Sequence, residues 1–228
     1  MKHCGKDCSS KIFGEIMKIA IFSKLTLKED EIKAIIDADV FPPIKRGDLL
    51  SPGMNKYDVI GIIDGVFLQN TAVGHREILY RLKEGKVIFG AGSMGALRAS
   101  ELDVYSMIGV GEVYKLYKEG AIVDDDEVAV TFDDDFNQIS FSLVSFRFMV
   151  KNAVEKGLIS KEEGDLLIKI AKSLYYPLRT FKNVLDKTDF SEEKKEKLLK
   201  FFESEEDIKR KDAFEMLYRI KDFVEKSN

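Results

Sequence analysis

Short apolar runs alternate with helical patterns through the first 140 residues of the chain. Runs of strand length lie at 18–22, 38–41, 58–64 and 86–91, and amphipathic stretches such as 72–84 lie between them. Strands that are joined by helices form a parallel sheet, and the helices then cover both of its faces. We therefore predict an α/β fold with a mostly parallel sheet flanked by helices.

The pattern changes after about residue 140, where amphipathic helices follow one another without strand-like runs between them. We predict three parts: a flexible N-terminal extension at 1–16, an α/β core domain at 17–140, and a helical C-terminal region at 141–228. Since no low-complexity linker separates the last two parts, we expect the helical region to pack on the sheet domain.

Composition narrows the classes of function. The formal net charge is −4, whereas proteins that bind nucleic acid generally are basic. No apolar run approaches the roughly 20 residues of a membrane span. The only two cysteines, Cys4 and Cys8, are too few for a disulfide framework, and with His3 they offer only a partial metal site. We expect a cytoplasmic protein that uses neither nucleic acid nor membrane, and no cofactor.

The stretch "DDDEVAVTFDDD" at 124–135 predicts an apolar strand between two acidic clusters. Carboxylates of this kind can hold Mg²⁺, but acidic residues more commonly form a solvated sheet edge that resists pairing with another sheet. We favour the solvated edge and expect no metal.

The stretch "KVIFGAGSMGALRASEL", from Lys86 to Leu102, predicts a strand, a glycine turn and a helix. Within it, Gly90–Gly95 is a literal G-x-G-x-x-G, the fingerprint of dinucleotide binding. The fingerprint also needs an acidic residue at the end of the next strand, about 20 residues on. Glu112 has that spacing, but it falls in a predicted helix over 109–120. A nucleotide-binding Rossmann-like enzyme is therefore a less favoured alternative.

The same turn places Ser93 between small residues, as in a nucleophile elbow. Backbone N–H groups around Gly92, Met94 and Gly95, at the start of the helix, can receive an oxyanion. A serine is also a favoured helix cap, so the motif alone leaves a nucleophile and a cap equally open.

A serine nucleophile needs a base. One of the two histidines, His3, lies in the predicted extension, and His75 lies near a helix start beside apolar residues, which favours a structural role. The other known arrangement is a Ser–Lys pair, whose lysine is held neutral by burial or by neighbouring positive charge. Lys45 in "FPPIKRGD" is the best placed, because its loop follows a strand and Arg46 adjoins it, although any single lysine is more commonly a surface residue.

Three loops follow predicted strands, at 42–48, 64–67 and 92–95. Ligands of parallel sheets gather beyond the carboxyl ends of the strands, so we predict that these loops converge on one site. Asp64 at a strand end either organises Lys45 or caps its own turn. Arg98 and Glu101, one turn apart on the next helix, either orient a substrate or form a surface ion pair.

Six blocks occur in an order that resembles the TfuA family: "FPPIKRGDLL", "IGIIDGVF", "VGHREIL", "VIFGAGSMGALRASEL", "MIGVGEVYKLYKEG" and "DDDEVAV". The resemblance is close over 17–130 and weaker around "YYPLRTF". It implies a partner of YcaO enzymes, which use ATP to activate a peptide backbone amide so that sulfur replaces oxygen. It also implies a hydrolase that releases sulfide from the C-terminal thiocarboxylate of a ThiS-like ubiquitin-fold carrier and helps YcaO engage its peptide.

The resemblance further implies a Ser–Lys pair. Mapped onto this chain, the serine is Ser93 and the lysine is Lys45. Lys86 is the runner-up because it is near Ser93 in sequence, but it opens its strand and should lie at the far end. Where the family pattern leads us to expect H-K-E-I-L, the chain has Arg76 after His75. A guanidinium stays charged and cannot replace a lysine base, which favours Lys45 or else implies loss of activity.

We expect the tail of the carrier to be bound by a set of residues around the turn: Gly92, Met94, Gly95, Asp64, His75, Arg98 and Glu101. A non-catalytic, allosteric adaptor of YcaO stays open as an alternative function. The Lys/Glu/Ile-rich composition suggests an archaeal-like protein, for which the thioglycine of methyl-coenzyme M reductase is the suggested product.

Overall fold

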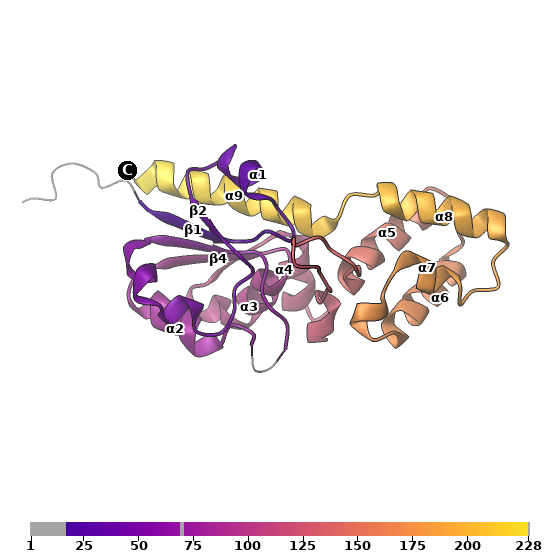
Figure 1. Cartoon of the computed structure of the whole chain (residues 1–228), viewed down its shortest axis with the longest axis horizontal. Helices are drawn as coiled ribbons and strands as arrows, with labels where there is room; N and C mark the ends of the chain where they lie inside the picture. The colour runs from indigo at the N-terminus through magenta and orange to yellow at the C-terminus, as the bar shows by residue number, and fades with distance from the viewer. Residues whose placement is uncertain (1–16, 69–70, 228) are drawn as a thin grey trace, which may run out of the picture.

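A computed structural model describes residues 17–68 and 71–227 (Figure 1). The described part contains a five-stranded, all-parallel sheet in the order β2-β1-β3-β4-β5. The strands are β1 (Ile19–Phe22), β2 (Asp39–Phe41), β3 (Val59–Ile62), β4 (Val87–Ala91) and β5 (Ile108–Val110). The predicted α/β fold with a parallel sheet is confirmed. The predicted extension and its partial metal site lie outside the described residues.

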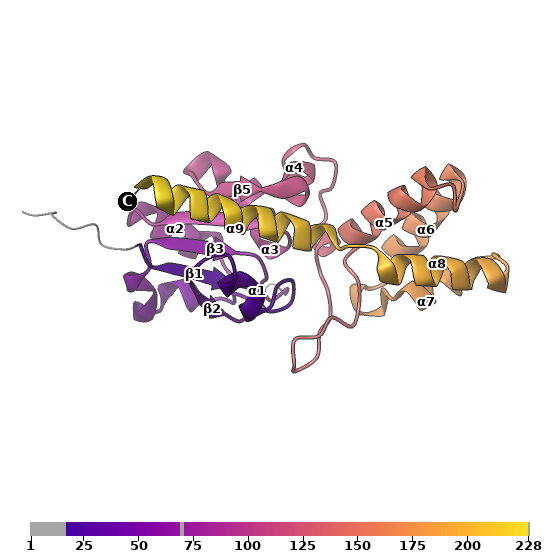
Figure 2. The ribbon, with the colours of Figure 1, turned by 90° about the horizontal axis from the view of Figure 1, so that it is seen from above.

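Helices cover both faces of the sheet, because side chains alternate along the strands. On one face, Ala20, Ile60 and Ile62 pack against α2 (His75–Lys83) and α3 (Met94–Leu102). On the other face, Ile21 and Val59 pack against α1 (Glu29–Lys33) and α9 (Ile208–Ser227). Figure 2 shows α9 lying along the sheet.

The predicted helical C-terminal region is confirmed. Its helices divide into two parts. Four helices form a separate lobe beside the sheet, with its own apolar core: α5 (Leu143–Glu155), α6 (Lys161–Ser173), α7 (Phe181–Leu185) and α8 (Glu192–Ser204) (Figure 1). The last helix, α9, returns to the sheet and buries Ala213, Met216, Leu217 and Ile220 there. In the sequence, α9 lies beyond the predicted boundary at residue 140, but in the structure it completes the core of the sheet domain. Among the described residues, no helix is both long and apolar enough to cross a membrane.

Two local predictions are wrong. The helix predicted over 109–120 is β5 followed by α4 (Gly111–Lys118), because three residues are too few to show a strand pattern. The strand predicted within 124–135 is a 3₁₀ turn at Asp125–Glu127 and a single bridge between Phe132 and Gln138.

The remaining 3₁₀ turns of the described chain are Asp48–Leu50, Pro52–Lys56, Asp103–Tyr105 and Tyr176–Leu178. At the start of α1, the backbone N–H of Lys28 donates a hydrogen bond to the carboxylate of Glu31 at 2.9 Å. Thr26 and Glu29 have the spacing of a capping box, but the Thr26 hydroxyl donates to Asp64 and does not cap the helix.

Candidate functional site

The turn between β4 and α3 is closed by its glycines. Gly92 has φ of +69°, which favours glycine, and the N–H of Ser93 donates to the carbonyl of Ala91 at 2.8 Å across it. A Cβ on Gly95 would lie 1.8 Å from the carbonyl oxygen of Ile62. The glycines therefore serve a tight turn and the close packing of a helix on the sheet.

The space beside the second glycine of the fingerprint is filled by the chain itself. A Cβ on Gly92 would lie 2.9 Å from the carbonyl oxygen of Lys209, at the start of α9. A dinucleotide needs that glycine open, because its pyrophosphate approaches the backbone there. Glu112 lies in a helix, as predicted: it is the second residue of α4, which directly follows β5, and its carboxylate pairs with Lys115 at 2.6 Å. The closed approach at Gly92 weighs against a bound dinucleotide.

Ser93 occupies the N-cap position of α3, but its side chain does not cap the helix. It is only 7% exposed, and within the described chain no hydrogen bond joins its side chain to the N–H groups of α3. Its hydroxyl instead donates weakly to the carbonyl of Val128, at 3.4 Å. The cap alternative therefore loses its basis, and the hydroxyl stays available for chemistry.

The predicted oxyanion donors are not equivalent. The N–H of Gly95 donates to the carbonyl of Ile63 at 3.1 Å, so this donor is already used. Met94 is the first residue of α3, where N–H groups lack partners within the helix. Of the two predicted donors within α3, Met94 and Gly95, only the N–H of Met94 remains a candidate.

The three predicted loops do meet. Ile44 pairs with Gly65, and the N–H of Ile44 donates to the carbonyl of Asp64 at 2.9 Å. A Cβ on Gly65 would lie 2.6 Å from the side chain of Met94. The loops after β2 and β3 and the turn after β4 therefore lie side by side, at the carboxyl edge of the sheet.

Neither predicted lysine is buried beside Ser93. The Lys45 side chain is 66% exposed and pairs with Asp48 at 3.3 Å, so it lacks the burial that the prediction required. Lys86 lies just before β4, at the amino edge, and donates to the carbonyl of Asn55 at 2.9 Å.

Asp64 serves the loop after β1 rather than Lys45. Its buried carboxylate accepts hydrogen bonds from the Thr26 hydroxyl at 2.6 Å, from the Thr26 N–H at 2.8 Å and from the Leu25 N–H at 3.0 Å. Burial raises the pKa of Asp64, while these hydrogen bonds and the nearby Lys209 act in the opposite direction.

Lys209 is the residue that sequence reasoning missed. It is 2% exposed, and its Nζ has two long contacts, to Gln138 Oε1 at 3.4 Å and to Asp207 Oδ2 at 3.6 Å. A lysine is seldom so buried unless it is paired, and Asp207 is the ion-pair partner of Lys209. In the sequence it is one of many lysines on amphipathic helices, and only the return of α9 to the sheet places it against Gly92.

A cavity of about 430 Å³ opens beside the turn. Its walls come from α3, from the start of α2 and from the converging loops: Arg46, Phe67, Leu68, Ala72, Val73, Gly74, His75, Met94, Leu97, Arg98 and Asp125. Glu101 Oε2 lies 2.8 Å from both Arg98 Nη1 and His75 Nε2. The structure thus brings together four of the predicted binding residues: Met94, His75 and Arg98 on the cavity wall, and Glu101 paired with two of them.

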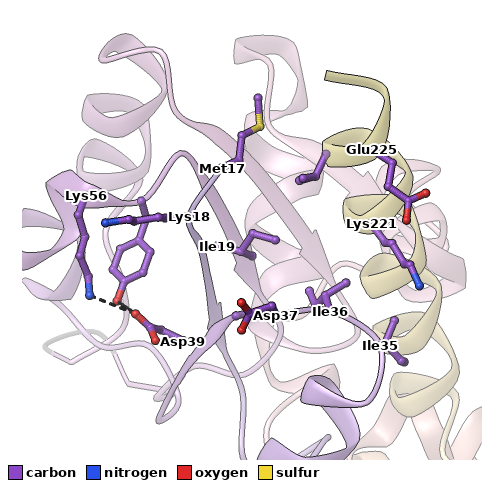
Figure 3. Close-up of a pocket in the computed structure, with 13 residues that line it drawn as sticks. Met17, Lys18, Ile19, Ile35, Ile36, Asp37, Asp39, Lys56, Lys221 and Glu225 are labelled. Atoms are coloured by element: carbon purple, nitrogen blue, oxygen red, sulfur yellow. Dashed lines mark hydrogen bonds and ion pairs between the residues drawn. The ribbon is translucent and has the colours of Figure 1, made fainter. Parts of the chain in front are cut away.

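A second cavity, of about 570 Å³, lies at the amino edge of the sheet. Figure 3 shows Met17, Ile19 and Ile36 in its floor and Lys56 reaching Asp39 at its side. It is remote from Ser93, which follows the carboxyl end of β4.

The acidic run is paired with basic residues. Asp124 pairs with Lys172 and Glu127 with Arg147, each at 2.7 Å, and Asp126 pairs with buried Arg179. The first acidic cluster, at 124–127, therefore fastens the helical lobe to the sheet domain, whereas the second cluster, at 133–135, is exposed to solvent. No cluster of three or more potential metal ligands occurs in the part of the chain that the structure describes.

A family model described as TfuA-like protein matches residues 64–180. The matched span contains the turn, most of the cavity wall and the acidic run, whereas Lys45 and Lys209 lie outside it. Comparison with curated proteins finds no match.

Proposed function

The chain belongs to the TfuA-like protein family, and on that premise we propose that it works beside a YcaO enzyme in peptide thioamidation. Its own reaction in this proposal is hydrolysis of the C-terminal thiocarboxylate of a ThiS-like sulfur carrier. The products are sulfide, which the YcaO reaction consumes, and a carrier that ends in a carboxylate.

One observation carries the proposal. Ser93 lies at the start of α3 with a side chain that does not cap the helix, and it adjoins Met94, which lines the cavity at the carboxyl edge of the sheet. Arg46 and Arg98 line this cavity, and Asp125 is the one carboxylate on its wall within the described residues, while Arg98 also pairs with Glu101 at 2.8 Å. Two guanidinium groups favour an anionic end group such as a thiocarboxylate.

For the proton acceptor we propose Lys209 in preference to Lys45. Lys209 is buried and its backbone touches the turn that holds Ser93, whereas Lys45 is exposed. Each of the two lysines pairs with an aspartate, Lys209 with Asp207 at 3.6 Å and Lys45 with Asp48 at 3.3 Å.

The proposed steps balance without any cofactor. The Ser93 hydroxyl gives its proton to the lysine as its oxygen attacks the thiocarboxylate carbon, and the N–H of Met94 faces the oxyanion. The C–S bond then breaks, sulfide leaves with the proton, and the carrier is held as an ester of Ser93. Water hydrolyses this ester, which restores the serine.

The test is sulfide release from thiocarboxylated carrier. We expect Ser93→Ala to lower the rate about a thousandfold or more. Ser100→Ala is the matched control, because Ser100 lies on the same helix and bonds only to the carbonyl of Leu97 there, at 2.7 Å. Lys209→Met should abolish release while Lys45→Met retains it; the reverse result assigns the base to Lys45.

A specific observation supports the adaptor alternative. The Ser93 hydroxyl contacts a carbonyl rather than a base, and the N–H of Gly95 is already bonded. If Ser93→Ala still supports thioamidation by YcaO with the carrier as the sole sulfur source, the hydrolase proposal is refuted and the adaptor takes its place.

A further inference from the structure

Exposed apolar side chains occur on both lobes next to Phe67 and Tyr176, whose rings are in contact, and Phe67 lines the cavity that Arg98 also lines. Leu68 is 56% exposed, Tyr175 is 64% exposed and Leu178 is 53% exposed. Such side chains are unremarkable singly, but a contiguous apolar patch on a surface marks an interaction site.

Printed contacts make this patch contiguous. The ring of Tyr176 packs edge-on against Phe67 with centroids 5.5 Å apart, and the rings of Tyr175 and Tyr176 lie 4.9 Å apart. The N–H of Leu178 donates to the carbonyl of Tyr175 at 2.8 Å, and Leu68 adjoins Phe67. We call these five residues the aromatic rim: Phe67, Leu68, Tyr175, Tyr176 and Leu178.

Both lobes build the aromatic rim, and the chain holds it in place. Phe67 and Leu68 follow β3, whereas the other three residues belong to the helical lobe. Arg179, which is 1% exposed, fixes the lobe side by bonding the carbonyls of Ala171 and Leu174 and the backbone and side chain of Asp126. A preorganised surface binds a partner at a lower entropic cost than a mobile one.

The cavity and the aromatic rim select the same kind of partner. The cavity wall carries Arg46 and Arg98 against Asp125, so it favours a slender segment that ends in an anion. Phe67 and Leu68 also line the cavity, whereas Tyr175, Tyr176 and Leu178 are not part of its wall, and tyrosines are common anchors of protein interfaces. A small molecule in the cavity would leave these last three residues uncovered, whereas a folded protein that inserts its anionic C-terminal tail covers them.

We propose that the aromatic rim docks the folded body of the carrier protein whose C-terminal tail enters the cavity. This inference rests on the proposed hydrolase function. It assigns affinity for the protein to the rim, and the chemistry at the terminal group to the turn.

The experiment compares two substrates of the full chain: the thiocarboxylated carrier, and a short peptide thiocarboxylate that copies only the carrier tail. In the double variant Tyr175→Ala, Leu178→Ala, we expect KM for the carrier to rise tenfold or more, with kcat and all constants for the peptide unchanged. Tyr218→Ala is the matched control, since Tyr218 is 56% exposed on α9 and belongs to no part of the rim.

Three results overturn the proposal: an unchanged KM for the carrier, an equal loss with both substrates, or weaker binding of YcaO with carrier kinetics intact. Direct binding of the carrier in its carboxylate form separates this proposal from the hydrolase. If wild type releases no sulfide from either substrate, the hydrolase fails. Docking at the rim then stands only if the double variant weakens that binding tenfold.

Discussion

The two edges of the sheet differ in the polar groups that are buried around them. The amino-edge cavity is the larger, at about 570 against 430 Å³, and its charged lining residues are exposed. At the carboxyl edge, Arg98 is the one buried charged residue on the cavity wall among the described residues, and Ser93, Lys209 and Asp64 are buried near the turn. Size therefore does not indicate which cavity carries the chemistry, whereas buried polar groups and converging loops do.

Carboxyl groups at the two edges show the same contrast. Burial raises the pKa of Asp64 and of Asp212, which caps the start of α4 beyond the carboxyl end of β5. At the amino edge, hydrogen bonds from Tyr57 and Lys56 lower the pKa of the exposed Asp39. At the carboxyl edge the polar groups are thus buried away from water beneath α9, whereas at the amino edge they are exposed to water.

The largest effect is expected at the carboxyl-edge turn. In Gly95→Ala, the new Cβ would lie 1.8 Å from the carbonyl oxygen of Ile62, so α3 must move off the sheet. We expect a loss of about 3 kcal/mol or more in the free energy of unfolding, measured by urea denaturation. Gly53→Ala at the amino edge is the control, because its nearest neighbour, Ser51 Oγ, is 3.7 Å away. Equal stabilities of the two variants would show that the turn is not tightly packed.

The next effect is a pH dependence caused by Asp212. Burial is the main cause that raises its pKa from 3.8 to about 6, while the N–H groups of Glu112 and Val113 oppose the shift. A raised folded-state pKa stabilises the protein below the unfolded value, and this stabilisation is lost as the pH rises through about 6.

Urea denaturation at two pH values measures this loss. We expect wild type to lose about 2 kcal/mol between pH 4 and pH 7 relative to Asp212→Asn. Asp222→Asn, at an exposed position of the same helix, should follow wild type. Parallel pH curves for Asp212→Asn and wild type would contradict the conclusion that burial at the carboxyl edge raises the pKa of Asp212.

The third effect separates the two cavities by function. Arg98 lines the carboxyl-edge cavity and is 9% exposed, whereas Lys221 lines the amino-edge cavity. We expect Arg98→Met to raise KM for the thiocarboxylated carrier about tenfold, because a charged hydrogen-bond donor is lost, and Lys221→Met to leave it unchanged. A KM for Arg98→Lys between those of Arg98→Met and wild type would support recognition of the tail by charge. A higher KM in Lys221→Met alone would indicate that the tail binds at the amino edge.

The sequence predicts the sheet well and the site unevenly. The first four strands are continuous apolar runs, and the glycine turn has a recognisable pattern, so both follow from local rules. The fifth strand, β5, has only three residues, Ile108–Val110, and they do not interrupt the helical pattern around them. For that reason the sequence did not predict this strand.

The site depends on long-range packing that local patterns do not contain. Lys45 has the right loop but an exposed side chain, and no feature of the loop reports burial. Lys209 lies 116 positions after Ser93 and reaches the turn only because α9 crosses back over the sheet (Figure 2). By contrast, Arg98 and Glu101 are three positions apart on one helix, so their pairing followed from helix geometry.

The smallest effect is expected at the amino edge, where Asp39 accepts hydrogen bonds from the Tyr57 hydroxyl at 2.5 Å and from Lys56 at 3.1 Å. These partners lower the pKa of Asp39, so they stabilise the folded protein above the unfolded value of 3.8, and this is lost as the pH falls through the lower folded value. Since the group is exposed, Asp39→Asn should change thermal stability little at pH 7, with a difference from wild type that disappears in acid. Sulfide release should equal that of wild type. If Asp39→Asn slows release as strongly as Ser93→Ala, the amino-edge cavity takes part in the reaction and the contrast between the two edges is lost.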